Sequence, residues 1–436
     1  MLISVVGAGY VGLVTAACLA HLGNEVRCVD RDTRLVTRLR AADPPIHEPG
    51  LAELVQAGLA GSRLSFDVDP ATVRGTGFVI VAVGTLDEGG GWTGDVVRQA
   101  VLDLARDADA PRQIVVRSTL MPGTAQAIAT DLASTNHGVE LAHNPEFTRE
   151  GSAVNDFLSP DRVVIGLADP SRETDLSRSL RHVYQPLGAP IVVTSLVSAE
   201  MIKVASNVFL ATKIAFANEL ARLAAATGAD VQAVVDGMGL DRRIGRSFLS
   251  PGPGFGGSCL PSQAQALPAH AASHGVTLQL MDAITGSNEG QAAWCVEQLE
   301  VRLGRELADA RVALLGMTFK AGTNDMRDSP ALRLARLLAA RGARLALYDP
   351  TSTEAARRLL ETDGIAATGA PSTLDACREA DAVVIATEWP EFHELDWTAV
   401  AEVMSGRVVF DTRNVIDVPA ARAAGLDAFV LGGRAD

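Results

Sequence analysis

One cysteine of this chain, Cys259, lies in a stretch that could make it a nucleophile. It follows the glycine-rich residues 254–258 and precedes Pro261 by two positions. Glycines let a backbone close around a ligand because they lack a Cβ and tolerate positive φ, and proline suits the first turn of a helix. A cysteine at the start of a helix lies where the helix dipole favours the thiolate, its reactive form. We therefore interpret Cys259 as a covalent catalyst.

A second chemical pattern opens the chain. Gly7, Gly9 and Gly12 form a G-x-G-x-x-G sequence after an apolar run, and Asp30 stands eighteen residues after Gly12. In a strand–turn–helix unit these glycines allow a close approach to a pyrophosphate, and the carboxylate binds ribose hydroxyls. Because a carboxylate repels a 2′-phosphate, the pattern predicts NAD as the cofactor. Arg31, next to the carboxylate, leaves NADP open.

Apolar runs that predict strands alternate with helical stretches. In the first half they cover residues 2–6, 25–30, 77–83, 113–117, 140–142 and 162–166. One long proline-free helix is expected from residue 195 to about 228, and short helical pieces from there to about 303. Strands resume at residues 312–316, 344–349, 382–387 and 408–411, with a helix over 330–341. The alternation predicts an α/β fold with two doubly wound, parallel-sheet Rossmann-like domains joined by a long central helix and a helical dimerisation region.

The expected domains follow from these elements. Residues 1–194 form the NAD-binding domain, residues 195–304 the central helical domain with the Cys259 loop, and residues 305–436 a C-terminal Rossmann-like domain. The apolar N-terminus has no basic start and is interrupted by the glycine motif, so we interpret it as a buried strand and helix rather than a signal peptide or membrane span.

Composition narrows the class of protein. The chain has 436 residues and a net charge of −14, which argues against binding the phosphate backbone of nucleic acid. Its five cysteines are scattered without C-x-x-C spacing, which indicates a cytoplasmic protein without a disulfide framework. His270 and His274 have a spacing that could bind metal, but no third ligand is near in sequence, so no metal is expected.

Lysine usage singles out three residues. Among 38 basic residues only Lys203, Lys213 and Lys320 are lysines, so each is a candidate for a role that the fork of an arginine cannot fill. Lys203 and Asn207 are spaced i, i+4 and should share one face of the long helix.

Motifs spread over nearly the whole chain resemble the UDP-glucose/GDP-mannose dehydrogenase family. Besides the Cys259 loop they are V-G-T at 83–85, R-S-T at 117–119, P-G-T at 122–124, N-P-E-F at 144–147, E-G at 150–151, A-E at 199–200 with Lys203 and Asn207, F-K-A-G-T-N-D at 319–325 and T-E-W at 387–389. Within the family the similarity is greatest to the members that act on UDP-glucose, particularly over residues 144–166 and 387–392.

This resemblance implies an NAD-dependent, four-electron oxidation of a nucleotide sugar at C6 to a uronic acid. Cys259 would form a thiohemiacetal and then a thioester, which water hydrolyses. The other catalytic residues implied are Lys203 and Asn207, which stabilise charge on the C6 oxygen, with Thr119 and Glu146 in water positioning and acid–base roles.

The resemblance also implies binding residues. For the cofactor they are Gly7, Gly9, Tyr10, Val11, Gly12, Asp30, Gly84, Thr85, Thr119 and Arg327. For the nucleotide sugar they are Phe147, Thr148, Arg149, Glu150, Lys203, Asn207, Arg243, Phe248, Gly256, Lys320 and Arg413. The protein would be at least a homodimer, with Arg243 reaching into the neighbouring subunit's site.

The chain departs from the family pattern at several positions. Relatives usually have Lys-Asp where this chain has Ser262 and Gln263, proline at Leu86 and leucine at Thr148. Glutamine cannot take a proton, although the loss of an anion beside Cys259 favours the thiolate. UDP-glucose is the default substrate. The same chemistry on TDP-glucose or GDP-mannose, and a weakly or non-catalytic sugar-nucleotide-binding protein, are the alternatives.

Overall fold

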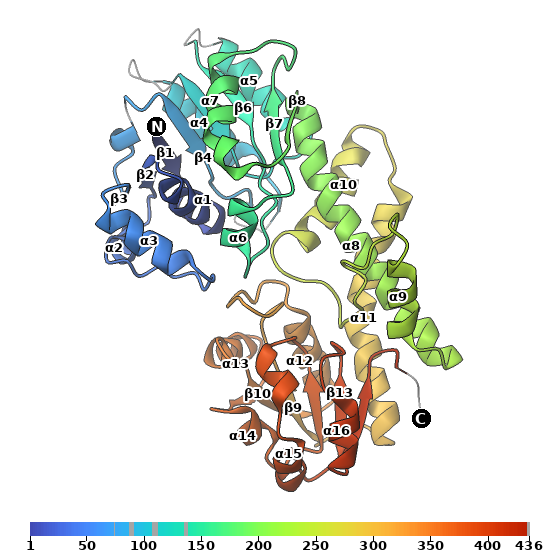
Figure 1. Cartoon of the computed structure of the whole chain (residues 1–436). Helices are drawn as coiled ribbons and strands as arrows, with labels where there is room; N and C mark the ends of the chain where they lie inside the picture. The colour runs from blue at the N-terminus through green and yellow to red at the C-terminus, as the bar shows by residue number, and fades with distance from the viewer. Residues whose placement is uncertain (74, 87–90, 107–111, 135–137, 434–436) are drawn as a thin grey trace. The chain divides into compact units, whose positions relative to one another are not determined.

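The computed structural model describes residues 1–73, 75–86, 91–106, 112–134 and 138–433. The chain forms two compact units, Met1–Ser206 and Asn207–Asp436. Figure 1 labels most of the helices and strands of both units. The boundary between the units lies inside one long helix. The division into three domains remains a prediction.

The first unit is an eight-stranded sheet with helices on both faces. The strand order is β3-β2-β1-β4-β5-β6-β7-β8. The strands are β1 Leu2–Val6, β2 Glu25–Val29, β3 Leu64–Asp67, β4 Phe78–Val81, β5 Gln113–Val116, β6 Glu140–His143, β7 Val163–Leu167 and β8 Ile191–Ser195. The helices are α1 Tyr10–His21, α2 Thr33–Arg40, α3 Leu51–Ala60, α4 Asp95–Ala105, α5 Thr124–Ser134, α6 Ala153–Leu158 and α7 Asp175–Tyr184, with short 3₁₀ turns at Pro70–Val73 and Gln185–Leu187.

The sheet is not parallel throughout, which differs from the sequence expectation. Strands β1 to β6 are parallel, but β7 runs antiparallel to β6, with Ala142 opposite Leu167 and His143 opposite Gly166. Strand β8 is parallel to β7. The reversal places the start of β7 at the edge where β4, β5 and β6 end, which is where ligands bind in open α/β sheets.

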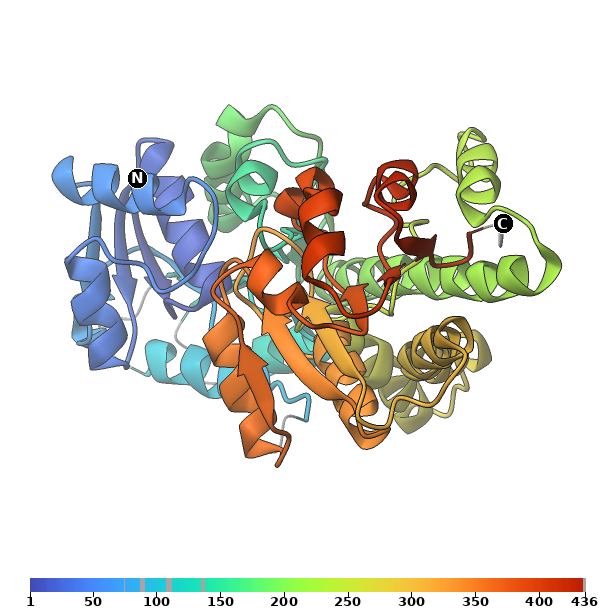
Figure 2. The same ribbon diagram turned by 90° about the horizontal axis from the view of Figure 1, so that it is seen from below.

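Helix α8, Leu196–Thr227, is a single helix of 32 residues, as the sequence predicted. Figure 2 shows it from below as one uninterrupted helix. It begins in the first unit and ends in the second, and it carries Lys203 and Asn207 one turn apart.

The second unit combines helices with a six-stranded parallel sheet of order β11-β10-β9-β12-β13-β14. The strands are β9 Arg311–Leu315, β10 Arg344–Tyr348, β11 Ala367–Gly369, β12 Ala382–Ile385, β13 Val408–Asp411 and β14 Asp427–Val430. The helices are α9 Val231–Gly239, α10 Leu260–Ser273, α11 Gln279–Leu303, α12 Pro330–Ala340, α13 Thr353–Thr362, α14 Thr373–Cys377, α15 Trp397–Val403 and α16 Val418–Ala423, with a 3₁₀ turn at Pro390–Glu394. Instead of short pieces, the segment before β9 contains α11, a helix of 25 residues.

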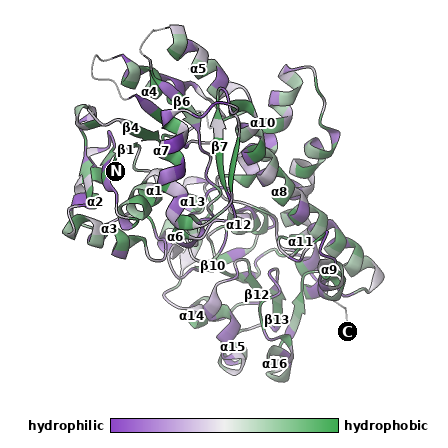
Figure 3. Cartoon of the chain, turned by 45° about the horizontal axis from the view of Figure 1, so that its top comes forward, coloured by the Kyte–Doolittle hydropathy of each residue, from purple (hydrophilic) through white to green (hydrophobic). Residues whose placement is uncertain are grey.

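Each unit has its own apolar core. Strands β4, β7, β12 and β13, none of which is at a sheet edge, are buried along their whole length. The hydropathy colouring of Figure 3 shows β4 and β7 in green. Helix α1 is buried from Gly12 to Ala20, because it packs on the sheet under other helices rather than at the surface. The turn that precedes α1 is therefore fixed to a rigid base.

Candidate active site

The G-x-G-x-x-G turn joins β1 to α1, and its three glycines serve two different purposes. Gly7 has a φ of +100°, and a Cβ there would meet the carbonyl oxygen of Ala82 at 2.6 Å. A Cβ on Gly12 would meet the carbonyl oxygen of Gly7 at 1.9 Å. A Cβ on Gly9 would meet no protein atom within 4 Å. Gly7 and Gly12 allow the close packing of the turn, whereas Gly9 leaves open space beside the backbone.

That open space lies where an anion would bind. Gly9 is the N-cap of α1 and supplies no side-chain cap to the helix. Asp30 follows β2 directly and accepts hydrogen bonds from the backbone N–H of Ala8, at 2.7 Å, and of Asp32, at 2.9 Å. An uncapped helix N-terminus, a glycine facing open space and a carboxylate at the end of the next strand fit the pyrophosphate and ribose of NAD.

Tyr10, the first residue of α1, is tied to a carboxylate that the sequence analysis did not single out. The Tyr10 hydroxyl donates to Glu48, and burial together with this bond raises the pKa of Tyr10 well above its ordinary value. Glu48 also accepts from the N–H groups of Gly151, at 2.6 Å, and Ala153, at 2.7 Å. Glu48 thus links the cofactor turn to the segment expected to bind the sugar nucleotide. Its contacts are remote in sequence, so no local pattern predicted them.

The remaining cofactor candidates of the first unit lie around the turn. Val11 is partly buried against the apolar core of the first unit. Gly84 has open space where a Cβ would stand, and the Thr85 carbonyl accepts from the N–H of Thr93 at 2.8 Å. Gly84 and Thr85 follow β4, at the carboxyl edge of the sheet, as expected for a cofactor site.

Lys203 and Glu146 form a buried ion pair. The Lys203 ammonium donates to Oε1 of Glu146 at 2.8 Å, and their side chains are only 2% and 5% exposed. Burial alone would raise the pKa of Glu146, but the charge of Lys203 and hydrogen bonds from Lys203 and Thr148 outweigh it and hold that pKa below its ordinary value. Glu146 is therefore ionised at neutral pH.

Thr148 contacts the second oxygen of the same carboxylate. Its backbone N–H and its hydroxyl both donate to Oε2 of Glu146 at 2.6 Å. Leucine, the residue that the family resemblance leads us to expect at this position, has no hydroxyl. The departure noted in the sequence thus places an additional donor on the candidate acid–base residue.

The neighbouring substrate candidates are held in different ways. The centroid of the Phe147 ring lies 3.8 Å from the guanidinium carbon of Arg162 and 5.4 Å from the Lys203 ammonium. Arg149 forms an ion pair with Asp156 of α6 at 2.6 Å. Glu150 follows in the same loop, directly before Gly151.

Thr119 lies in the loop between β5 and α5, and hydrogen bonds anchor the two residues that precede it. Ser118 donates to the carbonyl of Val83 at 2.7 Å. The buried Arg117 donates to Thr15, at 2.9 Å, and to Asn144, at 2.8 Å. Thr119 itself is only partly buried, between buried neighbours. Asn207, 9% exposed, belongs to the second unit and follows Lys203 by one turn of α8.

Cys259 is the N-cap residue of α10, where the sequence predicted a helix start, and Pro261 lies in its first turn. It is exposed, whereas the other four cysteines are buried, and its Sγ lies 3.5 Å from the Ser258 hydroxyl. Burial raises the pKa of Cys18 and of Cys377 to about 12, which makes them poor nucleophiles. Exposure and helix position therefore single out Cys259.

The loop before Cys259 packs too closely for larger residues. A Cβ on Gly256 would meet the carbonyl oxygen of Asp328 at 2.4 Å, and one on Gly257 would meet the ring of Phe319 at 2.9 Å. The Phe255 backbone exchanges two hydrogen bonds with Asn288 of α11, at 2.7 and 3.0 Å. The glycines thus let the loop lie directly on the C-terminal part of the second unit.

Gln263 is buried one turn after Cys259. Its side chain is 2% exposed, and its N–H donates to the carbonyl of Cys259 at 3.2 Å as part of the helix. Its side-chain oxygen Oε1 is buried and has no hydrogen-bond partner among the described residues. An unsatisfied buried acceptor is costly, so this oxygen is suited to a donor from a ligand or water.

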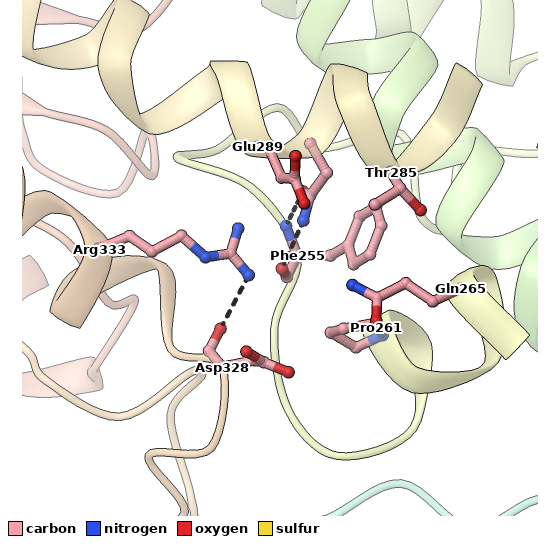
Figure 4. Close-up of a pocket in the computed structure, with 8 residues that line it drawn as sticks. Phe255, Pro261, Gln265, Thr285, Glu289, Asp328 and Arg333 are labelled. Atoms are coloured by element: carbon pink, nitrogen blue, oxygen red, sulfur yellow. Dashed lines mark hydrogen bonds between the residues drawn. The ribbon is translucent and has the colours of Figure 1, made fainter. Parts of the chain in front are cut away.

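A small pocket of about 120 Å³ lies beside the Cys259 loop (Figure 4). Arg333 extends from α12 and donates to the carbonyl of Asp328 at 3.4 Å. Typical ligand pockets measure about 300–1,000 Å³, so this one is too small to hold a whole nucleotide sugar. Its lining residues are Phe255, Pro261, Gln265, Thr285, Asn288, Glu289, Asp328 and Arg333.

Three basic residues, two expected to bind the nucleotide sugar and one the cofactor, lie in loops that follow the carboxyl ends of strands of the second sheet. Lys320 follows β9, and its ammonium lies 5.6 Å from the ring of Phe319. Arg413 follows β13, and its guanidinium donates to the carbonyl of Phe319 at 3.3 Å. Because Phe319 directly precedes Lys320, this bond brings Arg413 close to the backbone at Lys320. Arg327 pairs with Asp325 at 2.6 Å.

Two candidates lie in the segment after α9. Arg243 is 89% exposed and pairs with Asp241 at 2.6 Å. Phe248 has a φ of +63°, a left-handed conformation that a bulky residue adopts only under constraint. Among the described residues there is no group of three or more His, Cys, Asp or Glu side chains arranged to hold a metal ion.

Comparison with known proteins matches three parts of the chain to the three domains of one family. Residues 1–188 match the NAD-binding domain of the UDP-glucose/GDP-mannose dehydrogenase family, residues 197–290 its central domain and residues 313–418 its UDP-binding domain. The first match confirms NAD, the cofactor predicted from the glycine turn and Asp30. Within the described residues, no helix is long and apolar enough to cross a membrane.

Individual relatives agree with these matches. The chain is 39% identical to a UDP-glucose 6-dehydrogenase of Rhizobium meliloti (strain 1021), with 95% of each chain covered. It is similar to the structure of a UDP-glucose dehydrogenase from Pyrobaculum islandicum, with a TM-score of 0.89, 38% identity and coverage of 100% and 98%. A UDP-D-ManNAc dehydrogenase from Pyrococcus horikoshii gives a TM-score of 0.85 at 26% identity over 99% of each chain. The chain therefore belongs to the UDP-glucose/GDP-mannose dehydrogenase family.

Proposed function

We propose that this protein oxidises the C6 alcohol of UDP-glucose to the carboxylate of UDP-glucuronic acid. The observation that carries the proposal is Cys259, exposed at the start of α10 while the other four cysteines are buried. The substrate is supported by the relatives at 38–39% identity that are named for UDP-glucose.

NAD, when bound, supplies a hydride acceptor for each of the two oxidations. The alcohol first loses a hydride from C6 and a proton from its oxygen to give the aldehyde. The thiolate of Cys259 then adds to the aldehyde carbon, which forms a C–S bond and an alkoxide. Loss of the second hydride gives the thioester. Water attacks this carbon, the C–S bond breaks, and the products are a carboxylate, the free thiolate and protons.

The buried pair of Lys203 and Glu146 can handle the negative charge and the protons that these steps produce. The Lys203 ammonium can stabilise negative charge that develops on the C6 oxygen, and Asn207 can donate a hydrogen bond there. Glu146 is ionised, so it accepts a proton rather than donates one at the outset. We assign Thr119 to positioning of the attacking water.

The remaining assignments concern binding. The sugar nucleotide would be held by residues 147–150 and by Phe248, Gly256, Lys320 and Arg413, with Arg327 near the cofactor. We propose a homodimer in which Arg243 reaches the partner's site. Its support is the high exposure of Arg243, together with Phe209, Phe216 and Leu223 of α8, which are 64%, 46% and 59% exposed. The five free cysteines support a reducing, cytoplasmic location.

Two alternatives differ in testable ways. TDP-glucose or GDP-mannose would undergo the same chemistry. A weakly catalytic, sugar-nucleotide-binding protein is suggested by Gln263, which stands where relatives have aspartate. The deciding experiment measures NADH formed per nucleotide sugar consumed with UDP-glucose, TDP-glucose and GDP-mannose. Two NADH per UDP-glucose are expected. A stalled sub-stoichiometric burst, or binding without turnover, would contradict the proposal.

A further inference from the structure

Helix α5 begins directly after the loop that carries Thr119, and its first turn is capped from a distant part of the chain. Glu200 of α8 accepts hydrogen bonds from the N–H groups of Gly123, at 2.7 Å, and Ala125, at 2.6 Å. A helix that is capped by a side chain commonly uses its own N-cap residue, as α2, α7 and α9 do in this chain. Here the capping carboxylate is 75 to 77 residues away in sequence.

The capping carboxylate is completely enclosed. Glu200 is 0% exposed, and burial raises its pKa to about 7 despite the opposing effect of the two N–H donors. A buried carboxylate is costly unless its hydrogen bonds are satisfied, and a helix N-terminus is the site that favours its charge. The two short bonds therefore fix the end of the loop to α8 more firmly than a solvent-exposed cap would.

The cap connects two candidate catalytic residues. Glu200 and Lys203 are spaced i, i+3 and lie on neighbouring turns of α8. Ser118 anchors the loop before Thr119, and Glu200 anchors it after Thr119. Lys203 in turn holds Glu146. All of these residues belong to the first unit.

We propose that Glu200 is a positioning residue, which fixes the Thr119 loop relative to Lys203 and Glu146 for the oxidation at C6. The inference rests on the proposed function. Its physical basis is that a displacement of about 1 Å in a catalytic group can cost about 10²-fold in rate. Thr119 is only one of the expected cofactor contacts, and the others in the first unit, among them the glycine turn and Asp30, lie on other loops, so NAD binding should change much less than the rate. Glu200 does not need to touch the substrate.

The test compares Glu200→Gln with Glu140→Gln. Glu140 is a matched control, because its Oε2 also accepts from the N–H of a helix first turn, that of Leu176 in α7, at 2.9 Å. It lies at the start of β6, at the opposite edge of the sheet from the candidate site. We expect Glu200→Gln to lower kcat by about 10- to 100-fold with less than about threefold change in the KM for NAD, and Glu140→Gln to leave kcat unchanged.

A second variant covers the case that Glu200→Gln does not fold. Gly123→Ala strains the same end of the loop, at the residue whose N–H Glu200 accepts, because Gly123 has a φ of +97° but open space for a Cβ. We expect the same loss of kcat without loss of NAD binding. Full kcat in both variants, or equal losses in Glu200→Gln and Glu140→Gln, would overturn the positioning role. Absence of turnover in the unmodified protein would instead overturn the proposed function.

Discussion

Lys203 and Glu146 come from segments 57 residues apart and meet as an ion pair of 2.8 Å that is almost completely buried. Such a pair is weak evidence for stability, because the loss of hydration offsets much of the attraction between the charges. The pair is better explained by chemistry, since it holds an ammonium and an ionised carboxylate together at the expected site of oxidation.

Replacement of Lys203 by methionine tests this pair. The variant leaves Glu146 buried without its counter-charge, which costs about 3–5 kcal/mol of stability. We expect turnover to fall by more than about 100-fold, while the Kd of NAD, measured by titration calorimetry, changes by less than about threefold. Lys203→Met/Glu146→Gln, which removes both charges, should recover stability but not turnover. Equal loss of turnover and NAD binding in the single variant would indicate a structural role.

Thr148→Val tests the hydroxyl that donates to Glu146. This hydrogen bond lowers the pKa of Glu146, so its removal should raise that pKa. Because Glu146 acts in its ionised form, activity falls as the pH drops through its pKa. The acidic limb of the kcat/KM profile should therefore move to higher pH, by roughly 0.5–1 unit. Thr148→Ser keeps the hydroxyl and should keep the profile. An unmoved limb in the valine variant would refute the coupling.

Selective alkylation tests the identity of the nucleophile. In the folded protein iodoacetamide should modify Cys259 and spare the four buried cysteines, and peptide mass spectrometry identifies the site. Cys259→Ser should abolish this labelling and lower acid formation by roughly three orders of magnitude or more. Undiminished acid formation in that variant would exclude the thioester route.

Gln263→Asp tests the position one turn after Cys259. A buried carboxylate there disfavours the nearby thiolate, so the pH dependence of Cys259 alkylation should shift to higher pH. It also supplies a proton acceptor, so we expect faster release of acid from the thioester in single-turnover experiments. Ser262→Asp adds the same charge but lies on another side of α10, where Ser262 bonds back to the Ser258 carbonyl. Identical behaviour of both variants would show that position 263 has no specific role.

Alanine at two glycines of the cofactor turn separates binding from packing. At Gly9 the added methyl meets no protein atom, so Gly9→Ala should melt within about 2 °C of the unmodified protein. Its affinity for NAD should fall by at least about tenfold, because the methyl occupies space left for the pyrophosphate. At Gly12 the methyl collides with the Gly7 carbonyl, which should cost about 1–3 kcal/mol. Unchanged NAD affinity in Gly9→Ala would contradict the placement of the cofactor.

Local patterns in the sequence predicted the parts of the fold that have local causes. The glycine spacing gave the turn between β1 and α1, and a proline-free run gave α8 almost to its ends. The strands that the sequence analysis missed are β3, β8, β11 and β14, which are the two edge strands of each sheet. Edge strands are only partly buried, so they lack the continuous apolar run by which central strands are identified.

By itself, the sequence determined which residue types were available for the chemistry and which of them belong to the same element, such as Lys203 and Asn207. Tertiary structure alone decided the partners that are distant in the chain. It made β7 antiparallel to β6 and brought the ammonium of Lys203 into an ion pair with Glu146. It also brought Glu200 into hydrogen bonds with the first turn of α5, and Glu48 into hydrogen bonds with Gly151 and Tyr10. Hydrogen bonds and ion pairs between remote segments depend on burial and strand order, and neither is encoded in the spacing of neighbouring residues.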